Sequence, residues 1–136
     1  MTTSNHHQLA RDFFAAVASG TLPDDLVTPD LTAWTLSSGD ADRARFAGGI
    51  RMLAAIVAGE LAYTIESLTA EEDRVVAQVS SDWELVNGER AQNRHVFLFR
   101  IRDGRIASIA EYMDPRVPRE VIGPLIQAAL AGGSAD

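Results

Sequence analysis

Residues 90–106, RAQNRHVFLFRIRDGRI, decide the fold of this chain. Apolar side chains alternate with mostly polar ones, and Phe97, Phe99 and Ile101 share one side of the alternation. A period of two is typical of a β-strand that turns one face to the core. Asp103-Gly104 follows at once and favours a tight turn. The stretch therefore predicts a long strand that returns as an antiparallel neighbour.

The preceding residues continue this pattern. Residues 61–86 are rich in β-branched and aromatic side chains, and Asn87-Gly88 predicts a two-residue hairpin turn. Three long antiparallel strands should result. Both faces of this sheet carry apolar residues, and Trp83 lies on the face away from Phe97 in the register of that turn. We therefore expect a homodimer through the outer sheet face, including Trp83.

Helical spacing dominates the two ends of the chain. Residues 5–19 repeat apolar side chains at helical intervals, a short strand is expected over 31–36, and a second helix ends near Gly59. Gly48 and Gly49 lie inside that helix and suggest close packing or a ligand wall. A further helix is expected over 117–131, interrupted at Pro124. Helices before and after a strand meander predict an α+β domain.

The composition of the chain excludes several classes of function. The chain has 136 residues, no cysteine and a net charge of -7, so it suits one domain of residues 1–136 and excludes disulfides and thiol chemistry. The acidic balance argues against nucleic acid as a partner. No stretch is long and apolar enough for a membrane span, and we expect a cytoplasmic protein.

Polar residues converge beside the apolar strand face. The two-residue turn at Asn87-Gly88 would place Asp82 opposite Asn93 and Ser80 opposite His95. The next turn leaves two alternatives. A two-residue turn would set Tyr112 opposite His95, and a three-residue loop with a bulge would set Glu111 there.

A histidine and carboxylates inside an apolar concavity can move protons near neutral pH. The competing interpretation is a buried structural pair that does no chemistry. One histidine with two carboxylates is a poor metal set, so no metal is expected. His6 and His7 lie near the start of the chain and are expected to be solvated.

The sequence resembles the SnoaL-like branch of the nuclear transport factor 2-like superfamily. The resemblance covers roughly residues 9–114 and rests on RDFFAAV at 11–17, the strand ending at Trp34, HVFLFRIRDGRI at 95–106 and EYMD at 111–114. It implies a cone-shaped α+β barrel, a curved antiparallel sheet wrapped around a long helix with a central pocket, usually in a homodimer. It also favours the bulged turn that points Glu111 inward. The core would span about 5–116, with a flexible tail at 132–136.

The known active sites of this superfamily match the residues of this chain only in part. Ketosteroid isomerases have a tyrosine and a base aspartate where Phe13 and Thr35 appear here. Limonene-epoxide hydrolases have an arginine and two aspartates where this chain has Ser80, Asp82 and Glu111. Polyketide cyclases of the SnoaL kind use a pocket acid, which Glu111 or Asp82 with His95 would resemble.

The resemblance and the residues together predict an enzyme without a cofactor that performs acid/base chemistry on a hydrophobic, oxygenated small molecule. Isomerase, cyclase, dehydratase and hydrolase activities all fit. The alternatives are a non-catalytic binding module and a structural dimer whose pocket is filled. The expected catalytic residues are Glu111, Asp82 and His95. The expected substrate-binding residues are Trp34, Tyr63, Ser80, Asn93, Phe97 and Met113.

Overall fold

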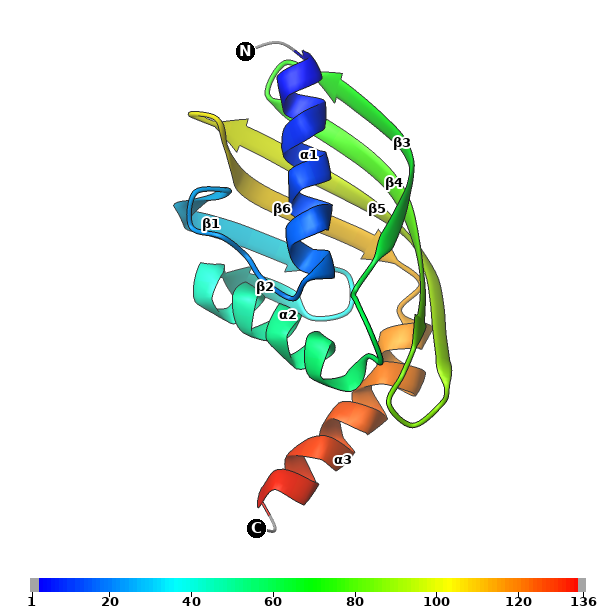
Figure 1. Ribbon diagram of the computed structural model, residues 1–136. Helices are drawn as coiled ribbons and strands as arrows, with labels where there is room; N and C mark the ends of the chain where they lie inside the picture. Colours follow the sequence, from blue (N-terminus) through cyan, green and yellow to red (C-terminus); the bar gives the residue numbers. More distant parts are fainter. Residues whose placement is uncertain (1–2, 135–136) are drawn as a thin grey trace.

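A computed structural model describes residues 3–134 of the chain. One curved sheet of six strands is covered on its concave side by helices (Figure 1). The elements, in chain order, are α1 (Thr3–Ala18), β1 (Val27–Thr35), β2 (Gly39–Asp42), α2 (Arg43–Ile56), β3 (Tyr63–Glu71), β4 (Arg74–Glu84), β5 (Arg90–Arg102), β6 (Arg105–Met113), a π-helical turn (Pro118–Ile122) and α3 (Gly123–Ser134). The predicted α+β class is confirmed.

The strand order is β2-β1-β6-β5-β4-β3. Strands β3 to β6 form an antiparallel meander of four strands where three were predicted, because residues 61–86 contain two strands, β3 and β4. Strand β1 runs parallel to β6, so the sheet is mixed. The edge strands are β2 and β3, and the sheet is therefore an open curved sheet rather than a closed barrel. The short strand β2 was not predicted, because GDAD carries no apolar alternation.

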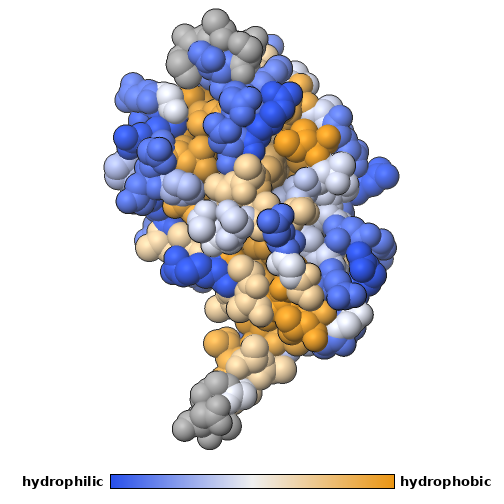
Figure 2. Space-filling view, in the orientation of Figure 1, coloured by the Kyte–Doolittle hydropathy of each residue, from blue (hydrophilic) through white to orange (hydrophobic). Residues whose placement is uncertain are grey.

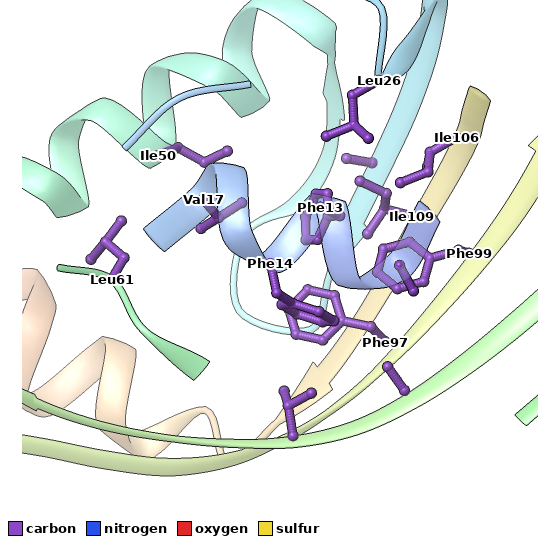
Figure 3. Close-up of a cluster of buried hydrophobic side chains, with 14 of the residues drawn as sticks. Phe13, Phe14, Val17, Leu26, Ile50, Leu61, Phe97, Phe99, Ile106 and Ile109 are labelled. Carbon is purple, nitrogen blue, oxygen red and sulfur yellow. The ribbon is translucent and has the colours of Figure 1, made fainter. Parts of the chain in front are cut away.

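Helix α1 fills the concave side of the sheet. Phe13 is 1% exposed and its ring contacts those of Phe14, Phe97 and Phe99, with centroids 5.1 to 6.0 Å apart (Figure 3). The helix ends where Gly20 takes a φ of 79°, a left-handed conformation that glycine adopts without strain. This aromatic cluster fixes α1 across the strands that carry the predicted site.

Helix α2 begins at a side-chain cap. The carboxylate of Asp42 accepts a 2.9 Å hydrogen bond from the backbone N–H of Arg45, which satisfies a free donor of the first turn. The cap is the last residue of β2, so the strand leads directly into α2. Apolar surface gathers at the lower end of the molecule, where α2 approaches the C-terminal segment (Figure 2).

The C-terminal segment departs from its predicted bounds. The helix does not break at Pro124, since the π-helical turn leads directly into α3, which continues to Ser134. Three residues predicted as tail are thus helical, and residues 135–136 of the predicted tail lie outside the described residues. No helix within residues 3–134 has the length and apolar character needed to cross a membrane.

Candidate active site

A cavity of about 950 Å³ lies between the concave sheet face and the helices. Its walls come from α1, α2, the turn between β1 and β2, all six strands and the C-terminal segment. Gly48 and Gly49 of α2 line it, and a Cβ built at Gly49 would meet open space. These glycines therefore form part of a cavity wall instead of a tight helix contact. The volume suits a small organic molecule.

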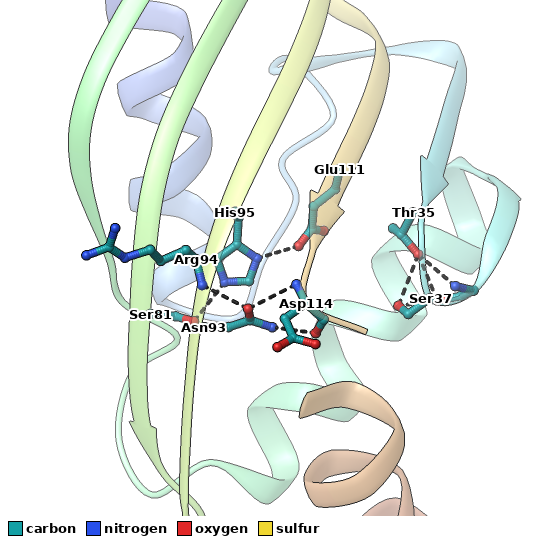
Figure 4. Close-up of polar contacts among 9 residues, drawn as sticks. Thr35, Ser37, Ser81, Asn93, Arg94, His95, Glu111 and Asp114 are labelled. Atoms are coloured by element: carbon teal, nitrogen blue, oxygen red, sulfur yellow. Dashed lines mark hydrogen bonds and ion pairs between the residues drawn. The ribbon is translucent and has the colours of Figure 1, made fainter. Parts of the chain in front are cut away.

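His95 is the centre of a chain of hydrogen bonds in the cavity wall. Its Nδ1 lies 2.8 Å from Oε2 of Glu111, and its Nε2 lies 2.8 Å from Oγ of Ser81 (Figure 4). His95 is 7% exposed and Ser81 6%, while the Glu111 side chain is 13% exposed. In the neutral tautomer with the proton on Nδ1, His95 donates from Nδ1 to Glu111 and accepts at Nε2 from the Ser81 hydroxyl.

Strand register brings these three side chains to one face. Phe97 pairs with Glu111 and His95 pairs with Met113, because β6 has one extra residue between Ile106 and Ser108. Neither predicted register of this hairpin is correct: the turn at Asp103-Gly104 has two residues, and the irregularity lies beyond it. Glu111 nevertheless faces the cavity on the same side as His95.

The other hairpin also differs from its prediction. Leu85 and Glu89 pair through a 2.8 Å backbone hydrogen bond, so the loop has three residues and Gly88 takes a φ of 87°. Ser81, not Asp82, therefore lies opposite Asn93. The shift by one residue exchanges the two faces of β4.

The structure corrects four predicted site or interface residues, three of them through the register of β4 and Trp34 through the pairing of β1 with β6. Asp82 and Ser80 lie on the outer face, where Asp82 is half exposed and bonds to Arg90 at 2.7 Å. Trp34 also points to the outer face and packs against Tyr112, with ring centroids 5.0 Å apart. Trp83 is 5% exposed on the cavity side, so it is not a dimer contact.

Tyr63 is placed beside the histidine. It pairs with Ser81 across β3 and β4, and its ring lies edge-on to that of His95 at 5.2 Å. Burial, and secondly the charge of Glu111, raise the pKa of the Tyr63 phenol well above its ordinary value. The phenol therefore stays protonated and can donate a hydrogen bond. The Trp83 ring also packs edge-on to that of Tyr63, with the ring centroids 5.5 Å apart.

Asn93 closes the same end of the sheet. Its amide nitrogen donates to the carbonyl of Asp114 at 3.0 Å, and its oxygen accepts from the Asp114 backbone N–H at 3.2 Å. The Arg116 guanidinium holds the pKa of the Asp114 carboxyl at about 2. Asn93, Phe97 and Met113, like Tyr63, line the cavity.

The sequence did not predict Ser81 as a site residue, because its inward orientation depends on the three-residue loop that ends at Gly88.

His6 was expected to be solvated, but it is 6% exposed and packed within the fold. Among residues 3–134, no group of three histidine or acidic side chains is arranged to hold a metal ion.

The SnoaL-like domain family model matches residues 10–109, most of the chain. The chain therefore belongs to the SnoaL-like domain family, and the resemblance inferred from the sequence is confirmed. No curated protein matches it.

Solved structures share the fold at low identity. An isomerase candidate from Bacillus subtilis is 18% identical, with a TM-score of 0.76, and the match covers 90% of this chain and 96% of that one. The polyketide cyclase candidate IdmH from Streptomyces antibioticus is 18% identical, with a TM-score of 0.72 and coverages of 86% and 97%. A ketosteroid isomerase-like protein from Catenulispora acidiphila, solved with trimethylamine, is 18% identical, with a TM-score of 0.65 and coverages of 76% and 83%. These likenesses show that the chain shares the fold of these proteins.

Proposed function

We propose that this SnoaL-like protein is an enzyme that moves a proton on a hydrophobic, oxygenated small molecule, with Glu111 as the base or acid. The observation that supports this is the 2.8 Å contact between Glu111 Oε2 and His95 Nδ1 in the wall of a cavity of about 950 Å³. A carboxylate and an imidazole held together away from bulk water are suited to acid/base catalysis.

Glu111 has one oxygen free for the reaction. Oε2 accepts from His95, whereas Oε1 makes no hydrogen bond within residues 3–134. We infer that Oε1 takes a proton from a carbon next to a carbonyl, and later returns it. His95 holds the carboxylate in place through Nδ1 and stabilises its charge.

The developing negative charge on the substrate oxygen needs a donor. The Tyr63 hydroxyl is protonated, lines the cavity and has no hydrogen-bond partner among the described residues. It can donate to a carbonyl oxygen that gains charge as the proton leaves carbon. Phe97 and Met113 supply apolar contact to the rest of the molecule.

The two rival functions make different demands. A structural dimer with a filled pocket does not fit a cavity of this volume. A binding module without chemistry would need the same cavity, but it would not require an unbonded Oε1 on Glu111. It would release its ligand chemically unchanged.

The test is turnover of a panel of cyclic ketones, lactones and epoxides, followed by mass spectrometry. Conversion of a panel member should be lost in Glu111→Gln and kept in Asp82→Asn, a matched carboxylate change on the outer face. Equal rates in the wild type and Glu111→Gln would refute the assignment. Tight binding with no product would favour the binding module.

We further propose a homodimer through the outer sheet face, now without Trp83. Leu98 is 39% and Tyr112 46% exposed on that face, beside the half-buried Trp34 and Val96. Exposed apolar residues grouped on one sheet face are typical of an interface. The cytoplasmic location stays a prediction from the sequence.

A further inference from the structure

We propose that Ser81 is a nucleophile and that the same cavity catalyses acyl transfer from hydrophobic esters or lactones to water. The inference goes beyond the proposed proton transfer, because it uses Ser81 Oγ and His95 Nε2 instead of Glu111 Oε1. It starts from the order of the contacts: Ser81 Oγ to His95 Nε2 at 2.8 Å, then His95 Nδ1 to Glu111 Oε2 at 2.8 Å. A hydroxyl, an imidazole and a carboxylate linked in this order are the parts that activate a serine.

Each proton has a defined place in this chain of contacts. Glu111 can only accept when ionised, so Nδ1 of His95 carries the proton between them. In the neutral imidazole Nε2 then has a lone pair, and the Ser81 hydroxyl donates to it. The base is therefore already in contact with the proton that it must remove.

Ser81 differs from a surface serine because its side chain is buried in the cavity wall. Ser81 is 6% exposed and lines the cavity, whereas Ser80, its neighbour in β4, faces the outer side of the sheet. A buried nucleophile in a mostly apolar cavity wall meets an ester that enters the cavity with less competition from bulk water than a surface serine would.

The oxyanion needs a donor other than the strand backbone, since the sheet ladder already uses the N–H groups of β4. Tyr63 is the cross-strand neighbour of Ser81 on the same face. Its free phenolic hydroxyl can donate to the acyl oxygen as charge develops there.

The reaction balances with water alone. Ser81 Oγ bonds to the acyl carbon while its proton moves to His95 Nε2, and the bond from the acyl carbon to the leaving alkoxide oxygen breaks as that oxygen takes the proton from Nε2. Water then attacks the acyl-serine and gives a proton to Nε2, which returns it to Ser81 Oγ as the acid leaves. The net change is ester plus water to acid plus alcohol.

The first experiment combines p-nitrophenyl butyrate hydrolysis with a fluorophosphonate probe and peptide mass mapping. The probe should add once, on the peptide that holds Ser81, and Ser80→Ala should be labelled like the wild type. Ser81→Ala should lose the label, and His95→Asn should slow labelling by about 100-fold. No adduct on the wild type, an adduct elsewhere, or unchanged labelling of Ser81→Ala would overturn the proposal.

A second variant guards against misfolding of Ser81→Ala. The chain has no cysteine, so Ser81→Cys introduces a single thiol whose alkylation by iodoacetamide can be followed alone. At pH 7 it should react at least about 10-fold faster than Ser80→Cys, because His95 Nε2 removes the thiol proton and favours the thiolate. A slower or equal rate would contradict an activated position. Solvent hydrogen exchange into ketones depends on Glu111 Oε1, so its persistence without acylation would leave the proposed function standing.

Discussion

Asn93 of β5 and Asp114, directly after β6, are joined by two hydrogen bonds: the side-chain amide of Asn93 donates to the Asp114 carbonyl and accepts from its N–H. The bonds fix the strand end directly beyond Glu111 and Met113. Loss of the amide would leave two backbone groups without partners and would loosen the wall that carries Glu111.

Asn93→Ala should therefore lower the free energy of unfolding by about 1–3 kcal/mol. Urea denaturation monitored by circular dichroism measures the change. Gln92→Ala, at the neighbouring exposed position, should stay within about 0.5 kcal/mol of the wild type. Equal stability of Asn93→Ala and the wild type would show that the two bonds contribute nothing.

Phe13 joins α1 to the sheet. Its ring contacts four other phenylalanines and it is 1% exposed, so Phe13→Ala should cost about 3–5 kcal/mol of stability. Leu130→Ala is the control, since Leu130 is 54% exposed on α3 and should cost little. Thermal unfolding checks both variants. A similar, small loss in each would mean that α1 is not held by this cluster.

The raised pKa of Tyr63 predicts how the stability of the fold changes with pH. Its pKa is raised in the folded state, so its stabilising contribution is complete below pH 10 and is lost as the pH rises beyond that value. The chain has two tyrosines, and Tyr112→Phe leaves Tyr63 as the only phenol. Absorbance titration of that variant should show ionisation well above pH 10. A midpoint at the ordinary value of about 10 would contradict the burial of Tyr63.

The proposed dimer should depend on Leu98 and Tyr112. Replacing both with glutamate places charges on the outer face and should shift the mass measured by light scattering from dimer to monomer. Glu66→Lys, at an exposed position of β3, should leave the mass unchanged. A wild type that is monomeric at high micromolar concentration would exclude the interface.

Most of the fold could be predicted from the sequence, because period-two and helical patterns of apolar residues are local. Phe97 and Phe99 identified the inner face of β5, and Phe13 and Phe14 identified the buried side of α1. The family resemblance added the curved shape. Strand β2 pairs with its chain neighbour β1 but carries no apolar alternation, and the parallel pairing of β1 with β6 depends on the packing of distant elements.

The inner face of β4 is the part of the candidate site that the sequence did not predict, for a specific reason. Asn87-Gly88 is compatible with both a two-residue turn and a three-residue loop in which Gly88 is left-handed, and the chain takes the second. That one residue moved Ser81 inward and Asp82 outward. Glu111 reached the cavity face through a bulge in β6 that the sequence does not mark.

Proton transfer by Glu111 is measured most directly by following deuterium from solvent into the α-carbon of cyclic ketones by NMR. We predict exchange with the wild type and with Asp82→Asn, and at least about a 100-fold slower rate with Glu111→Gln. Exchange that is equally fast in Glu111→Gln, or absent with every ketone while the wild type is folded, would contradict the account.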